Sequence, residues 1–276
     1  MPSGTVLVTG ASSGIGEATA LHLKELGFDA VAAVRKDEDA ERLAVSGLRT
    51  VRIDVTDSDS IAAARADLGD GPLAGLVNNA GIAVAAPLEF VPLDEFRHQL
   101  EVNLVGQLAV TQRFLPALRA GRGRIVNVSS IGGRVALPLL GAYHASKFAL
   151  EAVSDTLRRE LLSQGVDVVV IEPGGVRTPI WRKGEELATE LVAEMPPEAE
   201  RLYGRQVAAL RKQTGKIATE TGIEPREVAE AIGRALTAKR PRSRYLVGRD
   251  AKMRAPAAAV LPARVMDRLV GRAMGA

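Results

Sequence analysis

Three polar side chains have the types and the spacing that proton transfer to a small molecule requires. Tyr143 and Lys147 lie four residues apart at the start of a predicted helix, so both project from one face of it. A neighbouring ammonium favours the phenolate and lowers the pKa of a tyrosine from about 10, as an acid or base working near neutral pH needs. Ser130 ends a predicted strand, where its hydroxyl can reach a substrate. These residues predict acid–base chemistry.

A glycine-rich turn follows the first predicted strand and runs directly into a helix. Residues 9–16 read TGASSGIG. Glycine lets the backbone approach a ligand closely, and the N-terminus of the following helix offers free N–H groups to a pyrophosphate. The spacing differs from the G-x-G-x-x-G fingerprint, and Glu17 stands where a P-loop has lysine. The turn predicts a bound nucleotide, with tight helix packing as the alternative.

The charge at the end of the second predicted strand indicates which dinucleotide binds. An acidic residue there reads the ribose 2′-hydroxyl of NAD, whereas an arginine accommodates the 2′-phosphate of NADP. This strand ends in Val34-Arg35-Lys36, while Asp29 opens it and Asp37 follows the basic pair. We therefore expect NADP, with NAD less favoured. The alternative for Arg35 is a solvated charge.

The elements that must position these residues alternate between strand and helix. This alternation predicts an α/β fold, with a doubly wound, mostly parallel, Rossmann-like sheet in a single domain. Strands are expected at 5–9, 30–34, 50–53, 76–78, 124–128, 166–171 and 245–247, and helices at 14–27, 58–68, 94–119, 142–164 and 225–238. The carboxyl ends of parallel strands meet at one edge, so one crevice should hold the site.

Residues 181–222 interrupt this alternation. They are helical in pattern apart from Met195-Pro196-Pro197, and so long a connection is usually functional. We expect a helical lid over an apolar substrate, with Ile180, Trp181, Leu187 and Leu191 available to line the pocket. The alternative is a helical pair that only packs.

The C-terminal residues are basic. Residues 239–276 carry ten Lys or Arg against two Asp, so we expect a domain over 1–248 and a basic amphipathic tail over 249–276. Val265, Met266, Leu269, Val270 and Ala273 form one helical stripe, and Arg264, Arg268 and Arg272 form another. We favour packing of the apolar stripe on the protein or a second subunit over contact with an anionic membrane.

The composition excludes several classes of protein. Of 276 residues, 46% are apolar and 25% charged, as in folded globular domains, and the net charge of +3 gives no sign of nucleic-acid binding. The absence of cysteine excludes disulfides and thiolate ligands, and three scattered histidines predict no metal site. Apolar runs are shorter than the roughly 18 residues of a membrane span, and a strand from Thr5 leaves no room for a signal peptide. We expect a cytoplasmic protein.

Taken together, these motifs resemble the short-chain dehydrogenases/reductases. The likeness rests on residues 9–16 and 78–81, on Asn103, on Ser130 with Tyr143-x-x-x-Lys147, and on Pro173-Gly174, in the family's order over about residues 4–248. Residues 143–151 and the long insertion are most similar to the 17β-hydroxysteroid and retinol dehydrogenase branch. One departure is Ser13, where many NADP-using members carry a basic residue.

The resemblance implies an oxidoreductase that moves a hydride between NADP(H) and an apolar carbonyl or secondary alcohol. Tyr143 would be the acid or base, Lys147 would lower its pKa and hold the nicotinamide ribose, Ser130 would bind the substrate oxygen, and Asn103 would hold a water. The implied cofactor contacts are Gly10, Ser12, Ser13, Gly14, Ile15, Gly16, Arg35, Asp54, Val55, Asn79, Ala80, Gly81, Tyr143, Lys147, Pro173, Gly174, Val176 and Thr178. We also expect a homodimer or homotetramer. The alternatives are a non-catalytic dinucleotide sensor or scaffold and, less favoured, an epimerase or dehydratase.

Overall fold

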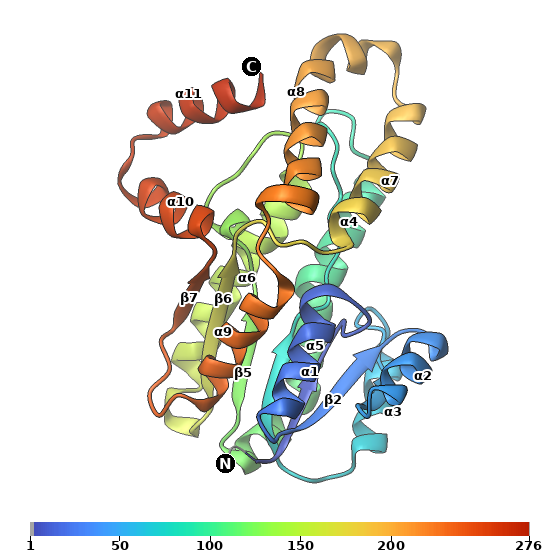
Figure 1. The fold of residues 1–276 in the computed structure, drawn as a ribbon, viewed down its shortest axis with the longest axis vertical. Helices are drawn as coiled ribbons and strands as arrows, with labels where there is room; N and C mark the ends of the chain where they lie inside the picture. The colour runs from blue at the N-terminus through green and yellow to red at the C-terminus, as the bar shows by residue number, and fades with distance from the viewer. Residues whose placement is uncertain (1–2, 276) are drawn as a thin grey trace.

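A seven-stranded parallel sheet forms the centre of the computed structural model, which describes residues 3–275 (Figure 1). Its strands are β1 Thr5–Val8, β2 Asp29–Val34, β3 Arg49–Arg52, β4 Leu73–Asn78, β5 Arg124–Val128, β6 Asp167–Pro173 and β7 Arg244–Val247. They lie in the order β3-β2-β1-β4-β5-β6-β7, and every neighbouring pair is parallel. The strand order reverses between β1 and β4, which is where such sheets bind ligands. The predicted doubly wound fold is confirmed.

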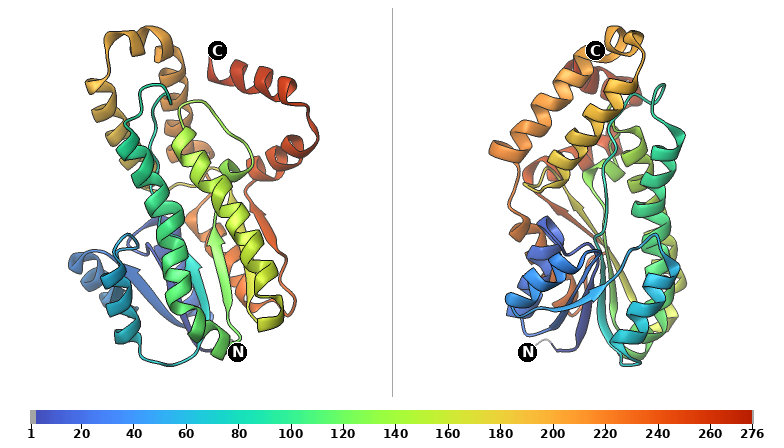
Figure 2. Two further views of the ribbon diagram at one scale, coloured as in Figure 1. Left: turned by 180° about the vertical axis from the view of Figure 1, so that it is seen from behind. Right: turned by 90° about the vertical axis from the view of Figure 1, so that its right-hand side faces the viewer.

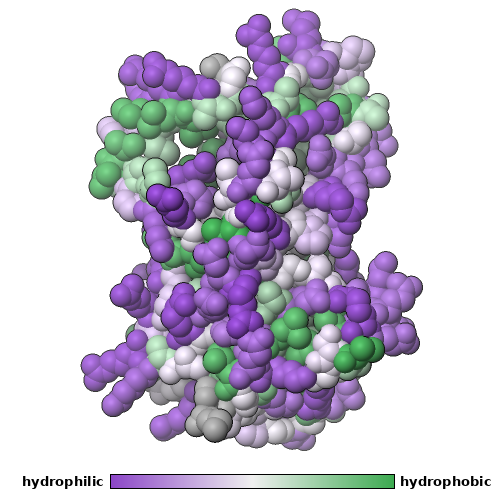
Figure 3. Space-filling view, in the orientation of Figure 1, coloured by the Kyte–Doolittle hydropathy of each residue, from purple (hydrophilic) through white to green (hydrophobic). Residues whose placement is uncertain are grey.

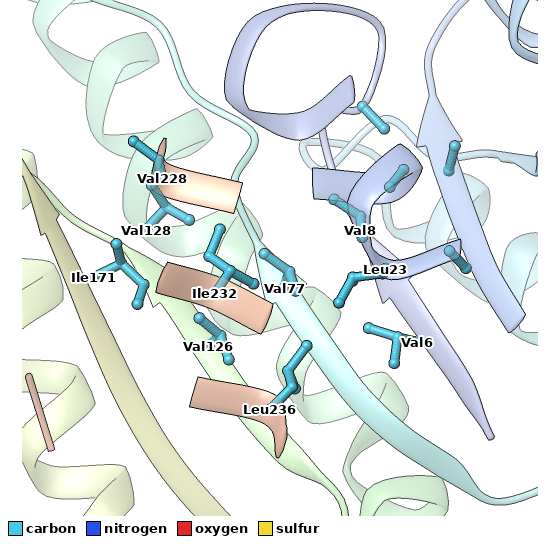
Figure 4. Packing of buried hydrophobic residues seen from close by; sticks show 14 of the residues in the cluster. Val6, Val8, Leu23, Val77, Val126, Val128, Ile171, Val228, Ile232 and Leu236 are labelled. Carbon is cyan, nitrogen blue, oxygen red and sulfur yellow. The ribbon is translucent and has the colours of Figure 1, made fainter. Parts of the chain in front are cut away.

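Helices cover both faces of the sheet, because its β-branched strands are apolar on both sides. The helices are α1 Gly14–Glu25, α2 Asp37–Val45, α3 Ser58–Leu68, α4 Leu93–Leu100, α5 Gly106–Gly121, α6 Gly141–Glu160, α7 Ile180–Glu194, α8 Pro197–Lys216, α9 Pro225–Thr237, α10 Arg249–Val260 and α11 Ala263–Met274. Side chains of α1 and α9 pack on one face, as Figure 4 shows for Leu23 and Ile232. Phe114 of α5 is fully buried on the other face.

The predicted helix over 94–119 is interrupted. A π-helical turn, Glu101–Val105, separates α4 from α5 and contains Asn103. Such a turn adds a residue to the helix and is frequent at functional sites. The expectation of one continuous helix was therefore wrong, since hydrophobic periodicity does not distinguish a single π-turn from α-helix.

The predicted lid consists of two helices, α7 and α8, between which the chain reverses direction. Both lie beyond the carboxyl ends of the strands (Figures 1 and 2). The chain turns between them at Met195 and Pro196, because a proline cannot continue the preceding helix. A second π-turn, Ile217–Thr221, ends α8 before the chain returns to the sheet through α9. The segment thus overhangs the edge where the motifs meet.

The tail follows β7 as α10 and α11. Its apolar stripe is divided in the structure. Met266 and Val270 pack against buried clusters, whereas Val265 and Leu269 are exposed. Packing on the protein therefore uses only part of the stripe. Within residues 3–275, no helix is both long and apolar enough to cross a membrane.

Candidate active site

One large cavity lies at the carboxyl ends of the strands, with a volume of about 750 Å³. It extends from the glycine turn and the end of β2 to α6 and the start of α7. The predicted site residues that line it are Gly10, Ser12, Ser13, Gly14, Ile15, Arg35, Asp54, Val55, Asn79, Ala80, Gly81, Asn103, Ser130, Tyr143, Lys147, Pro173, Gly174, Val176 and Thr178. The topology thus brings together residues that lie far apart in the sequence.

Gly16 differs from the other predicted residues because it is buried behind the turn. A Cβ at this position would collide with the Gly10 carbonyl oxygen and the Asn79 side-chain amide. Gly10 and Gly14 instead adopt positive φ values of 64° and 59°, which glycine tolerates without strain. Gly16 therefore lets α1 pack closely on the turn, which was the alternative interpretation of this motif, while the first two glycines shape the surface of the cavity.

Asn79 holds the glycine turn against the end of β4. Its side-chain amide donates to the carbonyl oxygens of Thr9 and Gly10, at 3.0 and 3.1 Å. The Thr9 hydroxyl accepts in return from the backbone N–H groups of Asn79 and Ala80, at 3.0 and 3.1 Å. These bonds position the turn at the strand-order reversal.

Ser130, Tyr143 and Lys147 meet in the cavity from two elements. Ser130 follows β5 and Tyr143 lies in the first turn of α6, and both side chains line the cavity. The Lys147 ammonium lies 5.9 Å from the centre of the Tyr143 ring and donates to the Val128 carbonyl oxygen at 2.9 Å. The two hydroxyl groups and the ammonium therefore face the same cavity.

Burial controls the ionisation of both titratable residues. It raises the pKa of Tyr143, an effect that the nearby Ser130 hydroxyl opposes, so the phenol is protonated at neutral pH. This direction is opposite to the one expected from the sequence, because desolvation of the buried phenolate is the larger cause. Burial also lowers the pKa of Lys147 to about 8, and the nearby carboxylate of Glu151 opposes that shift.

A buried group of charges lies behind α6. Glu172 is fully buried, and one of its oxygens contacts Arg134 at 2.8 Å and Arg244 at 3.3 Å. Arg244 also contacts Glu151 at 3.2 Å and Asp155 at 2.9 Å. Glu151 lies one helical turn after Lys147 on α6, so this network holds the part of α6 that carries Lys147. Sequence reasoning did not find it, because its members come from four segments: the turn after β5, α6, β6 and β7.

Asn103 connects α6 to the loop after β4. Its side chain accepts from the Ile82 N–H at 2.9 Å and donates to the Ile82 carbonyl oxygen at 3.0 Å. It also donates to the Ser146 hydroxyl at 3.1 Å. Asn103 thus positions the helix that carries Tyr143 and Lys147, and its expected contact with a water stays a prediction.

The end of β2 forms the opposite end of the cavity. Arg35 and Lys36 lie there beside Ser12 and Ser13. Burial pushes the pKa of Asp54 upward, but hydrogen bonds from Thr56 and the charge of Arg35 outweigh it and leave this pKa below its usual value. Lining residues that sequence reasoning missed are Lys36, Glu38, Asp39, Ile82, Ala83, Glu95, His98 and Val102. The acidic first turn of α2 was an available signal for Glu38 and Asp39.

An apolar pocket of about 50 Å³ lies beneath the lid, and Ile180 and Trp181 line both it and the large cavity. The Trp181 indole N–H donates to the Val176 carbonyl oxygen at 2.7 Å, which fixes the start of α7. Leu187 lines the large cavity as expected, whereas Leu191 is buried in a cluster with Val84, Ala86 and Ala142. Sequence reasoning missed the pocket residues Ala85, Ala86, Leu139, Leu140, Val207 and Leu210.

Comparisons with known proteins agree with this geometry. The family model described as short chain dehydrogenase matches residues 4–188. A 3-amino-tetrahydro-pyrrolizinone reductase of Xenorhabdus hominickii is 38% identical over 252 residues, covering 90% of this chain and 88% of the relative. Retinol dehydrogenase 5 of Mus musculus is 38% identical over 275 residues, covering 95% and 86%. A short chain dehydrogenase of Burkholderia cenocepacia J2315, solved in complex with NADP, superposes with a TM-score of 0.76 at 28% identity, covering 97% of each chain.

Proposed function

The chain belongs to the short-chain dehydrogenase family of oxidoreductases, and on that premise we propose that it transfers a hydride between NADP(H) and the carbonyl or secondary alcohol of an apolar substrate. The observation that carries the proposal is the meeting of Ser130, Tyr143 and Lys147 in a cavity that also contains the glycine turn. A dinucleotide fits these residues, because the two left-handed glycines lie at one end of that cavity and the acid–base group at the other.

The residues divide the work of carbonyl reduction among them. The hydride is supplied by NADPH when it is bound, and the protein provides position and proton transfer. Ser130 donates a hydrogen bond to the substrate oxygen, and Tyr143, whose pKa burial raises further so that it is protonated at neutral pH, gives that oxygen its proton. Lys147 holds a positive charge beside the developing phenolate below about pH 8. In alcohol oxidation the phenolate would accept the proton instead.

The preference for NADP rests on Arg35 and Ser12. Both line the cavity at the end of β2, where a ribose 2′-phosphate would lie in this fold. The solved Burkholderia cenocepacia relative, described as a complex with NADP, supports the same cofactor. Glu38 and Asp39 lie close by, so the preference depends on whether the basic groups outweigh these two carboxylates.

The apolar nature of the substrate follows from the pocket beneath the lid. Its lining is mainly aliphatic, with Ile180 and Trp181 nearest to the large cavity. The relatives named as retinol dehydrogenases are consistent with an apolar substrate. We also propose that the protein assembles as a homodimer or homotetramer, which sedimentation would measure.

The decisive experiment is a substrate screen with purified protein. Oxidation of NADPH is followed with aliphatic, aromatic and polar ketones, and NADH is tested in parallel. We expect turnover that is fastest with NADPH and an apolar ketone. Tight NADPH binding without turnover of any ketone would instead indicate a dinucleotide sensor or scaffold.

A further inference from the structure

The C-terminal tail contacts several of the loops that form the site. Asp250, in the first turn of α10, accepts a hydrogen bond from the Gly175 N–H at 2.9 Å, next to the predicted cofactor contact Gly174. Ala251 and Ala255 are buried in a cluster with Ile131, which directly follows Ser130. The tail is therefore joined to the machinery of the site rather than appended to the sheet.

The last helix ends against the wall of the apolar pocket. Met274 is only 1% exposed and lies in one cluster with Leu139, Leu140 and Leu210. Those three leucines also line the pocket beneath the lid, whereas Met274 packs behind them. Figure 1 shows the end of α11 approaching α8, to which α11 makes its contacts. Tyr143 packs on the same cluster.

The wall that Met274 supports is held in an unfavourable backbone conformation. Leu139 has a φ of +69°, a region that branched side chains rarely occupy. Its carbonyl oxygen accepts from the Ala86 N–H at 2.8 Å, which ties this loop to another segment of the pocket. A strained residue persists only where surrounding contacts determine its position, and strain of this kind clusters at ligand sites. Met274 supplies part of that surrounding packing.

We propose that Met274 is a specificity-determining residue that limits how long an apolar substrate the pocket accepts. Its side chain packs in one buried cluster with Leu139, Leu140 and Leu210, so it holds these three lining residues of the pocket in place. Because the pocket is narrow, at about 50 Å³, the position of this wall decides which chain lengths fit. The inference rests on the proposed function, since it names the substrate feature that the same site reads.

The outer face of α11 provides a matched control. Leu269 lies on the same helix but is 51% exposed and outside the Met274 cluster. Figure 3 shows apolar side chains along α11 and the turn before it, bordered by hydrophilic side chains. Replacing Leu269 with alanine therefore removes a similar side-chain volume from the same helix without opening the pocket.

The experiment compares Met274→Ala with Leu269→Ala. Values of kcat/KM are measured with NADPH and a short or a long methyl ketone, 2-butanone or 2-decanone. Shortening a core side chain leaves space behind it, and one methylene in an apolar pocket changes discrimination about tenfold. We expect Met274→Ala to raise the ratio of long-chain to short-chain kcat/KM by about that factor, and Leu269→Ala to leave the ratio unchanged.

A binding measurement separates this inference from the proposed function. The affinity for cis-parinaric acid, a linear fluorescent probe, is measured without turnover, and Met274→Ala should bind it more tightly than Leu269→Ala does. If the wild-type protein reduces no ketone, the proposed function fails, while probe affinity still decides the role of Met274. If Met274→Ala does not fold, Val270→Ala in the same cluster should shift both readouts in the same direction. Equal ratios and equal probe affinities in folded variants would overturn the inference.

Discussion

The site has a dinucleotide end, in the large cavity, and a proposed substrate end, in the apolar pocket beneath the lid, and these two ends are built in different ways. At the dinucleotide end, short motifs adopt defined backbone conformations and hold one another by hydrogen bonds, as Gly10, Thr9 and Asn79 do. At the substrate end, side chains from distant segments pack by shape alone, as Leu139, Leu210 and Met274 do. Ser130, Tyr143 and Lys147 lie where the two ends meet.

The difference teaches where this fold tolerates change. A buried polar group that loses its partner costs about 1–3 kcal/mol, so the hydrogen-bonded turn admits few substitutions. Aliphatic packing tolerates exchanges of similar volume at less than about 1.5 kcal/mol. The substrate end can therefore vary its shape while the dinucleotide end is retained, and each variant below tests whether the two ends are separable.

The largest effect should come from the point where the ends meet. Tyr143→Phe removes the transferable proton but keeps the ring, and general acid catalysis contributes roughly 10²–10⁴-fold. We expect kcat to fall by that order while NADPH affinity, measured by fluorescence, stays within a few-fold. Tyr245→Phe, on β7 and away from the cavity, serves as the control. A Tyr143→Phe enzyme that keeps more than about a tenth of its kcat would rule out Tyr143 as the acid.

Arg35→Asp should act on the dinucleotide end alone. The new carboxylate repels a 2′-phosphate and accepts from a 2′-hydroxyl, and a charged contact of this kind contributes about 1.5–3 kcal/mol, roughly a ten- to hundredfold effect. We expect the ratio of kcat/KM for NADPH to that for NADH to fall by this factor, with an unchanged KM for the ketone. Arg49→Asp, at the start of the neighbouring strand β3 and outside the residues that line the cavity, is the control. An unmoved cofactor ratio would show that Arg35 is only a solvated charge.

Trp181→Phe should act mainly on the substrate end. It keeps an aromatic ring in the pocket but removes the 2.7 Å hydrogen bond to the Val176 carbonyl oxygen. A hydrogen bond of this kind contributes about 1 kcal/mol, so the KM for an apolar ketone should rise about fivefold. Because Val176 also lines the cavity, NADPH affinity is measured in the same variant. An equal weakening of ketone KM and of NADPH affinity would mean that the two ends cannot be changed separately.

The smallest effect concerns the positive charge of Lys147, which lies where the two ends meet. Burial lowers the pKa of Lys147 to about 8, so its ammonium is present below that pH and is lost as the pH rises through it. NADPH affinity, followed by fluorescence against pH, should therefore weaken above about pH 8. Glu151→Gln removes the carboxylate that raises this pKa, and the transition should move to lower pH.

Asp155→Asn is the control for Glu151→Gln, because Asp155 also contacts Arg244 but lies at the more exposed edge of the same network. Its pH transition should match that of the wild-type protein.

The same pKa of Lys147 also predicts how the stability of the protein depends on pH. Lys147 is charged in the unfolded chain up to its ordinary pKa of 10.5, so the free energy of unfolding should rise between about pH 8 and that value. If Glu151→Gln leaves the pH of this transition unchanged, the buried network does not influence the pKa of Lys147.

Much of the dinucleotide end could be predicted from the sequence. The turn containing Gly10 and Gly14, the basic end of β2 and the four-residue spacing of Tyr143 and Lys147 are local patterns. In a parallel sheet, local patterns at strand ends have a known place, because all carboxyl ends meet at one edge. The same logic predicted that Ser130 would join them. The helical pattern of residues 181–222 predicted the helices α7 and α8, whose role as a lid stays a prediction.

The tertiary structure decided what depends on distant neighbours. Gly16 proved to be a packing residue, Leu191 a core residue and Leu139 a strained wall, because burial and backbone conformation are set by segments that the local sequence does not contain. Burial likewise reversed the expected pKa direction of Tyr143. Periodicity and spacing along the chain thus determined the fold and the edge at which the motifs meet. The shape of the proposed substrate pocket and the ionisation of Tyr143 came from packing, since desolvation and volume are properties of all the atoms that surround a group.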